Sequence, residues 1–402
     1  MKRMKYNTKA IEIPKALSIY LNELVDVLKK KKKNITSLSL GESFLDVPYF
    51  GFDDIDFTKG YHYSDSKGLP ELRKKISHYY NKNYNSKIDH ENIIVSAGSK
   101  IILYMCFLAI INPKDEILVH EPAWLSYKEQ IKLAGGKVKY FPHYESLSKL
   151  EKYVEKKTKA MVISSPNNPA GRLYSRKELN LIYKICLKKN IYLIVDEAYS
   201  DFVLNKKFIS CSNIDKSLKN LIIVNSLSKN LGMSGWRIGY LISNESFVDI
   251  VQTLNQHLLT CAPTVLQMYI IKNFEKILSF TKPQIKNLLQ KRKRIEKMLK
   301  DLKLKYIKSS STFYFFLDAS EFQKDIFNFA INLLLDHNIS IVPGQAYGEN
   351  TNNFFRISIG TETEKNIHEA LKIIKYNLLN KKYSNIETQK KLKNYSLKQF
   401  KY

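Results

Sequence analysis

Residues 225–240 read NSLSKNLGMSGWRIGY, and this stretch indicates both the fold and the chemistry of the chain. It begins where the apolar segment 221–225 ends, and it places Lys229 between polar residues with Arg237 eight positions later. In a chain this basic, a single lysine is usually a solvated surface residue. A lysine buried after a strand, however, loses proton affinity and can form a Schiff base with an aldehyde. The neighbouring hydroxyls, arginine and glycines favour the second interpretation.

Short β-branched segments alternate with helix-length segments around this stretch, which is typical of a mostly parallel sheet covered by helices. The strands of one large α/β domain are expected at Ile93–Val95, Glu116–His120, Lys137–Phe141, Ala160–Ser164, Ile191–Val195, Leu221–Asn225 and Ile238–Ile242. Helical segments dominate from Val251 to about Leu302. Later strands are expected at Thr312–Leu317, Ser340–Val342 and Asn353–Ile359, which indicates a second, smaller α/β unit.

A chain of 402 residues is long enough for two domains. Residues 10–33 are expected to form one amphipathic helix. The apolar positions of this helix are Ile19, Leu21, Leu24, Val25 and Leu28. The domain limits that we expect are 1–45 for an N-terminal segment joining the small domain, 46–275 for the large domain, 276–380 for the small domain and 381–402 for a flexible basic tail.

Lysine and arginine outnumber aspartate and glutamate by 65 to 38, so the formal net charge is +27. Such an excess raises the question of nucleic acid or an anionic membrane as a partner. The tail 381–402 and the run Lys29–Lys33 hold part of the excess, and the rest is scattered. We therefore expect mostly solvated surface charge, no nucleic-acid or membrane partner, and a smaller role in collecting anionic substrates.

Several classes of site lack their sequence signatures. The chain has neither GxGxxG nor GxxxxGK[ST], so the phosphate loops of dinucleotide and NTP sites are missing. The 8 histidines are dispersed, the 4 cysteines have no CxxC spacing, and no metal site is predicted. The longest apolar run, Ile101–Ile111, is too short to cross a bilayer, and the opening residues lack the apolar stretch of a secretory signal. A cytoplasmic location is expected.

Polar residues also follow other predicted strands, at the edge where open α/β sheets bind ligands. Gly98, Ser99 and Lys100 lie at a strand-to-helix turn that suits an anion, although a plain helix cap would use the same residues. Asn168 stands between two prolines in the loop SSPNNPAG, which holds its amide at low entropic cost. Asp196 directly follows a buried strand, where a carboxylate needs a cationic or hydrogen-bonded partner unless it is only a helix cap.

Together with FFRIS at 354–358, these ordered motifs resemble those of the class I and II aminotransferases, which depend on pyridoxal 5′-phosphate (PLP). The resemblance runs from about Ser37 to Ile374. It implies fold type I, an α/β fold. In this fold a large PLP-binding domain has a mostly parallel seven-stranded sheet between helices, and the N- and C-terminal segments build a smaller α/β domain.

The resemblance implies a role for each matching residue around the PLP ring. Lys229 matches the lysine that forms the Schiff base with PLP and later moves a proton between substrate and cofactor. Asp196 matches the carboxylate that keeps the pyridine nitrogen protonated, so that the ring accepts electrons. Tyr199 and Asn168 match the two donors to the phenolic oxygen. Trp124 matches the aromatic residue that stacks on the ring, with a core tryptophan as the alternative.

Other matching residues concern the phosphate, the substrate and a second subunit. The residues expected to hold the phosphate are Gly98, Ser99, Ser226, Ser228 and Arg237, and Lys100 is also expected among the cofactor-binding residues. Arg356 matches the arginine that binds the substrate α-carboxylate, where a lysine would be a poorer fork. Gly41 matches a glycine that lies beside the substrate, and Asn168 is also expected to contact the substrate. Tyr63 matches the tyrosine that reaches the phosphate of the neighbouring subunit, so a homodimer with shared active sites is implied.

Two positions depart from the common pattern of the family. Ser43 stands where proline often follows the Gly-Glu pair, and Ile101 stands where glutamine often follows Gly-Ser-Lys. Both positions lie near the substrate side chain in the family, so the substrate stays open. Lys100 is either a contact for a second anionic group, as in some aspartate-specific relatives, or a surface lysine.

The sequence therefore predicts an aminotransferase that moves an amino group between an amino acid and an oxo acceptor, with an acidic or phosphorylated substrate favoured by the positive charge. The alternatives on the same fold are decarboxylation of a phosphorylated amino acid of the phosphoserine or phosphothreonine type, β-elimination and oxidation, because the motifs secure the cofactor and not the bond that breaks. A basic regulatory protein without activity is a third class. The presence of Lys229, Asp196, Arg237 and Arg356 argues against it.

Overall fold

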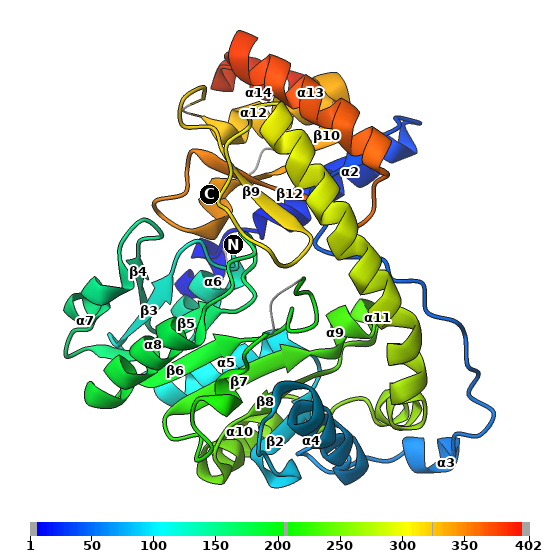
Figure 1. Cartoon of the computed structure of the whole chain (residues 1–402), viewed down its shortest axis with the longest axis vertical. Coiled ribbons are helices and arrows are strands. Elements are labelled where there is room, and N and C mark those ends of the chain that lie inside the picture. The colour runs from blue at the N-terminus through cyan, green and yellow to red at the C-terminus, as the bar shows by residue number, and fades with distance from the viewer. Residues whose placement is uncertain (1–5, 205–207, 324, 396–402) are drawn as a thin grey trace, which may run out of the picture.

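The computed structural model describes residues 6–204, 208–323 and 325–395 (Figure 1). A seven-stranded sheet forms the centre of the larger part, with the strand order β2-β8-β7-β6-β5-β3-β4. Its strands are β2 (Ile93–Ser96), β3 (Glu116–His120), β4 (Lys137–Phe141), β5 (Thr158–Ser164), β6 (Tyr192–Asp196), β7 (Leu221–Ser226) and β8 (Gly239–Ile242). Only β8 runs antiparallel to its neighbours β2 and β7, so the prediction of a mostly parallel seven-stranded sheet is confirmed.

Helices cover both faces of this sheet, because successive strand residues point to opposite sides. On one face, Val95 and Met161 belong to a core cluster with α4 (Pro70–Tyr84), α8 (Arg176–Lys188) and the first part of α11 (Thr264–Asp301). On the other face, Ile94 and Val162 belong to a cluster with α5 (Ser99–Ile110), α6 (Ser126–Leu133) and α10 (Glu245–Leu258). Burial on both faces explains why these strands are continuous apolar runs in the sequence. Short helices in the connections are α3 (Phe57–Gly60), α7 (Leu150–Tyr153) and α9 (Leu227–Asn230).

The smaller part contains an antiparallel sheet of three strands in the order β11-β12-β9 and a pair of short parallel strands, β1 and β10. The strands are β1 (Thr36–Ser37), β9 (Tyr314–Asp318), β10 (Ile339–Ser340), β11 (Val342–Pro343) and β12 (Phe354–Ser358). The helices α12 (Ile326–His337) and α13 (Glu364–Asn380) and the second half of α11 pack around the sheet. Figure 1 shows α11 running from the larger sheet up to this smaller part. The expected domain limit at residue 275 thus falls inside a continuous helix.

The N-terminal segment joins the smaller part through helix α2 (Leu17–Lys30), whose apolar face packs in one core cluster with α12. The prediction of one helix over residues 10–33 is wrong. The chain forms α1 (Thr8–Glu12) and α2, with Pro14 between them, because a proline disfavours helical backbone in the residue before it. Ile19, expected on the apolar face, is 51% exposed.

Two further expectations need correction. The single strand predicted at 340–342 is two strands in different sheets, because the chain changes partner at Ile341: β10 pairs with β1, and β11 pairs with β12. The tail expected to be flexible contains α14 (Asn385–Asn394), whose Leu392 is buried and whose Thr388 hydroxyl lies 2.6 Å from Asn332 Nδ2 on α12. Residues 396–402 of that tail lie outside the described residues. Within the described part of the chain, no helix has the length and hydrophobicity required to span a membrane.

Candidate active site

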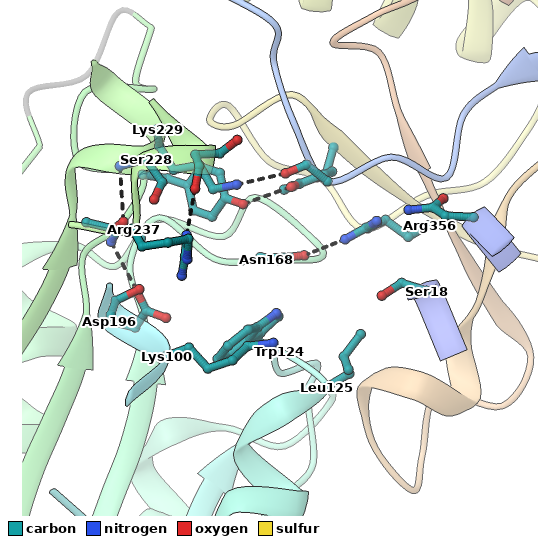
Figure 2. Close-up of a pocket in the computed structure, with 18 residues that line it drawn as sticks. Ser18, Lys100, Trp124, Leu125, Asn168, Asp196, Ser228, Lys229, Arg237 and Arg356 are labelled. Carbon is teal, nitrogen blue, oxygen red and sulfur yellow. Dashed lines mark hydrogen bonds between the residues drawn. The ribbon is translucent and has the colours of Figure 1, made fainter. Parts of the chain in front are cut away.

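A cavity of about 220 Å³ lies where the carboxyl ends of the larger sheet face the smaller part of the molecule. All the site residues predicted from the sequence line it, except Gly98 and Tyr63. Figure 2 shows Lys229, Asp196 and Arg237 on one side of the cavity, Arg356 and Ser18 on the opposite side, and Trp124 between them. Segments far apart in the sequence thus meet around one space large enough for a small molecule.

Lys229 projects into the cavity from α9, directly after strand β7. Ser226 caps the N-terminus of this helix: its hydroxyl accepts a hydrogen bond from the backbone N–H of Ser228 at 3.1 Å. The Lys229 Nζ atom donates to the backbone oxygen of Gly41 at 2.8 Å. Burial lowers the pKa of Lys229 to about 8, and the nearby carboxylate of Glu42 opposes this effect. A large fraction of the amine is therefore unprotonated in mildly basic solution, as a nucleophile or base requires.

Asp196 ends strand β6 on the floor of the cavity. Its Oδ2 atom accepts a hydrogen bond of 2.6 Å from the Tyr127 hydroxyl, and its Oδ1 atom accepts one of 3.0 Å from the Ala198 N–H. Burial raises the pKa of Asp196. Among the described residues it takes part in no salt bridge, so a cationic N–H group in the cavity would relieve the cost of its burial.

Glycines shape one end of the cavity into a cradle for an anion. Gly98 precedes α5 with a φ of 92°, and a Cβ atom there would lie 2.5 Å from Arg237 Nη2. A Cβ on Gly239 would lie 2.3 Å from the backbone nitrogen of Ser99. Only glycines allow the first turn of α5, the strand β8 and the guanidinium to approach this closely. The helix N-terminus, Arg237 and the hydroxyls of Ser226 and Ser228 form a donor set that suits a phosphate.

Arg356 comes from β12 and is almost fully buried. Its Nη1 atom donates to Asn168 Oδ1 at 3.1 Å and its Nη2 atom donates to the backbone oxygen of Ser39 at 2.7 Å. Its Nε atom has no hydrogen-bond partner among the described residues. A buried guanidinium with a donor to spare suits a ligand carboxylate. The same bond uses the Asn168 oxygen, which leaves the amide nitrogen of Asn168 for a ligand.

Trp124 and Lys100 lie next to each other in the lining of the cavity. The Lys100 Nζ atom lies 5.2 Å from the centroid of the Trp124 ring, a cation–π distance. Burial and the charge of Arg237 lower the pKa of Lys100. Both residues line the cavity.

Tyr63 lies apart from these residues, in the connection between α3 and α4, and is 84% exposed. Ser43 and Ile101, where the chain departs from the family pattern, are not among the residues that line the cavity.

Several residues of the site were missed from the sequence. Tyr127 holds Asp196, Tyr314 contacts Tyr199, and Ser18 and Asn22 of α2 line the cavity. The sequence carries no signal for them, because each stands in an ordinary helical or apolar strand pattern.

Comparisons with known proteins agree with this geometry. Residues 52–374 match the sequence model of aminotransferase class I and II. The chain is 31% identical over 369 residues to an aspartate aminotransferase of Thermotoga maritima, covering 90% of this chain and 96% of that protein. It is 33% identical over 360 residues to (5-formylfuran-3-yl)methyl phosphate transaminase of Methanocaldococcus jannaschii, covering 88% and 94%.

Among solved structures, a Thermotoga maritima aspartate aminotransferase matches with a TM-score of 0.84 at 30% identity, covering 93% of this chain and 100% of that chain. The family and the fold predicted from the sequence are therefore confirmed. From its sequence, its fold and the residues gathered in its cavity, this chain belongs to the class I and II aminotransferases, PLP-dependent transferases of fold type I.

Proposed function

We propose that this aminotransferase binds PLP in the cavity around Lys229 and moves an amino group between an amino acid and an oxo acceptor, one of which carries a second anionic group. The observation that supports this most directly is the pairing of a buried amine, whose pKa burial lowers to about 8, with the buried carboxylate of Asp196 in one cavity. Arg356 faces both from the opposite side.

The charged groups and hydrogen-bond donors of the cavity fit PLP. The cradle at Gly98, Ser99 and Arg237 suits the phosphate, and the unpaired carboxylate of Asp196 suits a protonated ring nitrogen. When bound, PLP supplies an aldehyde that links to an amine and a ring that takes up electrons from the substrate Cα. Tyr199 and Asn168 supply donors between these two ends, and Trp124 offers its ring face.

Each of these residues has a different role in the proposed reaction. Lys229 holds or releases a proton at Nζ, because its pKa of about 8 lies near the working pH of most enzymes. Asp196 keeps its negative charge when a cation lies beside it. Arg356 binds the α-carboxylate through two forked donors and so orients the substrate towards Lys229.

Lys100 supports a substrate with a second anionic group. Its ammonium lies at the cavity beside Trp124, and no salt bridge involves it among the described residues. The relatives named above include an aspartate aminotransferase and a transaminase of a phosphorylated compound. Both names are those of transaminases, so the decarboxylase alternative is not favoured.

The reaction is tested by incubating the holoenzyme with single amino acids and separating the products. An oxo acid formed together with bleaching of the cofactor absorbance supports transamination, and release of carbon dioxide without bleaching would overturn it. Borohydride should fix the cofactor to the wild-type protein and to a control with Lys184→Ala, an exposed lysine of α8, but not to Lys229→Ala. A reduced adduct on Lys229→Ala protein would refute the assignment of Lys229.

The variant Lys100→Ala tests the proposal that Lys100 contacts a second anionic group on the substrate. This variant should raise the KM for aspartate at least tenfold while leaving the KM for alanine within about twofold, because one charge-assisted hydrogen bond contributes roughly 1.5–3 kcal/mol. An equal change for both substrates would contradict the assignment of Lys100.

A homodimer with shared sites is also part of the proposal. Tyr63 is 84% exposed, and exposed aromatic side chains also occur close to it in the sequence, Tyr49 at 81% and Tyr61 at 77%; exposed aromatic residues of this kind suit a protein interface. Mixing Tyr63→Phe and Lys229→Ala subunits tests the sharing, because each hybrid dimer then contains one unaltered site. Activity that does not rise above that of either variant alone would contradict it. A cytoplasmic location stays a prediction from the cysteine usage, and all four cysteines are free.

A further inference from the structure

Tyr314 meets Tyr199 across the boundary between the two parts of the molecule. Tyr314 comes from β9 in the smaller part and is fully buried, and Tyr199 lies just after β6 in the larger part. Their hydroxyl oxygens are 2.8 Å apart, and either hydroxyl can be the donor. This is the only side-chain hydrogen bond of Tyr199 among the described residues. The two phenols therefore hydrogen-bond to each other, and both line the cavity.

The direction of this hydrogen bond depends on what else Tyr199 binds. Each phenol has one proton and can also accept a hydrogen bond. If Tyr199 donates its proton to a ligand, its oxygen can only accept from Tyr314, and Tyr314 must be the donor of the pair. Without that donor, the buried oxygen of Tyr199 would have no partner within the protein.

The surroundings of the pair favour Tyr314 as the donor. Arg356 on β12 places its guanidinium carbon 4.5 Å from the centroid of the Tyr314 ring. Burial raises the pKa of both phenols, so both keep their protons, and Arg356 lowers the pKa of both. Its guanidinium lies directly over the ring of Tyr314, so it favours Tyr314 as the donor.

The other charged groups around the pair come from three elements. Asp196 at the end of β6 raises the pKa of Tyr199, and Glu42 in the N-terminal segment raises that of Tyr314. The ammonium of Lys229 on α9 lies 5.6 Å from the Tyr199 ring. The two carboxylates and Arg356 thus act in opposite directions, and Arg356 is the group stacked on the Tyr314 ring itself.

We propose that Tyr314 is a positioning residue: its hydroxyl donates to Tyr199 and so directs the Tyr199 proton at the phenolic oxygen of the cofactor. This inference rests on the proposed function, in which Tyr199 is a donor to that oxygen. A residue on strand β9 of the smaller part would thus control the direction in which Tyr199 of the larger part donates its hydrogen bond.

The test compares Tyr314→Phe with Tyr347→Phe in the full-length protein. Tyr347 is a matched control, because it is also buried and also lies over Arg356, at 5.5 Å, but its hydroxyl has no hydrogen-bond partner among the described residues. Each apoprotein is titrated with PLP and with 3-deoxypyridoxal 5′-phosphate, which lacks the phenolic oxygen. The pH dependence of the visible absorbance is then measured for the PLP-loaded proteins.

Tyr314→Phe should weaken PLP binding about three- to tenfold, as expected for one lost hydrogen bond, and leave the affinity for the 3-deoxy compound within about twofold. Its absorbance should titrate at a higher pH than that of the wild type. Tyr347→Phe should change neither quantity. Equal weakening for both compounds would show a merely structural role, and no weakening for either would also overturn the inference.

A Tyr314→Met variant gives the same comparison if the Phe variant does not fold. The wild-type protein separates this inference from the proposed function. If the wild-type protein does not bind PLP, the proposed function fails. If it binds PLP and Tyr314→Phe behaves as the wild type does, only the role of Tyr314 fails.

Discussion

Replacing Gly98 with alanine perturbs the end of the cavity that suits a phosphate. Gly98 has a φ of 92° and a ψ of 158°, a conformation that residues with a Cβ atom rarely adopt. The new Cβ would lie 2.5 Å from Nη2 and 3.2 Å from Cζ of Arg237. The guanidinium must therefore move away from the turn, or the turn must move away from strand β8.

The two effects of this substitution have different sizes and different readouts. Backbone strain of this kind costs about 1–3 kcal/mol, which lowers the free energy of unfolding of the apoprotein. Displacing Arg237 would remove the charge-assisted hydrogen bond that we propose between its guanidinium and the phosphate, which would contribute about 1.5–3 kcal/mol. Since each 1.4 kcal/mol is tenfold in affinity, PLP binding should weaken by about 10- to 100-fold.

Both quantities are measured on the same apoprotein, by urea unfolding and by titration with PLP followed by absorbance. Gly235→Ala is the matched control, because a Cβ atom at Gly235 meets no heavy atom within 4 Å. We expect the control to stay within about 0.5 kcal/mol of the wild type in stability and to bind PLP equally well. A Gly98→Ala protein that binds PLP within twofold of the wild type would refute the reasoning.

Three further predictions concern other parts of the molecule. Burial lowers the pKa of Lys229 from 10.5 to about 8, so between these pH values the unfolded chain binds more protons and this group makes stability rise with pH. In Lys229→Met apoprotein this rise in stability, up to about 3 kcal/mol, should be missing when urea unfolding curves at pH 7 and pH 10 are compared. An unchanged rise would contradict the burial of the amine. Arg356→Leu should raise the substrate KM far more than the PLP dissociation constant. Equal increases in both constants would contradict the proposal that Arg356 binds the substrate carboxylate. Leu392→Ala removes a buried side chain and should cost about 2–5 kcal/mol of local stability, seen as faster hydrogen exchange in α14, whereas unchanged exchange would mean that α14 does not depend on this contact.

Local patterns in the sequence were enough to predict the large sheet and most of the cavity. Strands β3 and β4 have the predicted bounds, and the interior strand β3 is a short apolar run with clear ends because most of its residues are buried. The polar residues directly after such runs, Asp196 and Lys229 among them, meet at one edge because neighbouring parallel strands end there. These features depend on a few adjacent residues, so the sequence alone carries them.

Packing between distant segments determined the features that the sequence did not predict. Tyr314 stands in the apolar strand YFFLD, and Tyr127 stands in a helix; only the docking of the smaller part on the larger one brings Tyr314 to Tyr199. The exchange of strand partners at Ile341 and the packing of α14 on α12 are likewise long-range choices. Hydrophobic periodicity indicates which face of an element is buried, but it does not identify the partner, because many apolar surfaces bury one another about equally well. The tertiary structure alone therefore determines which polar groups surround the residues that the motifs identify.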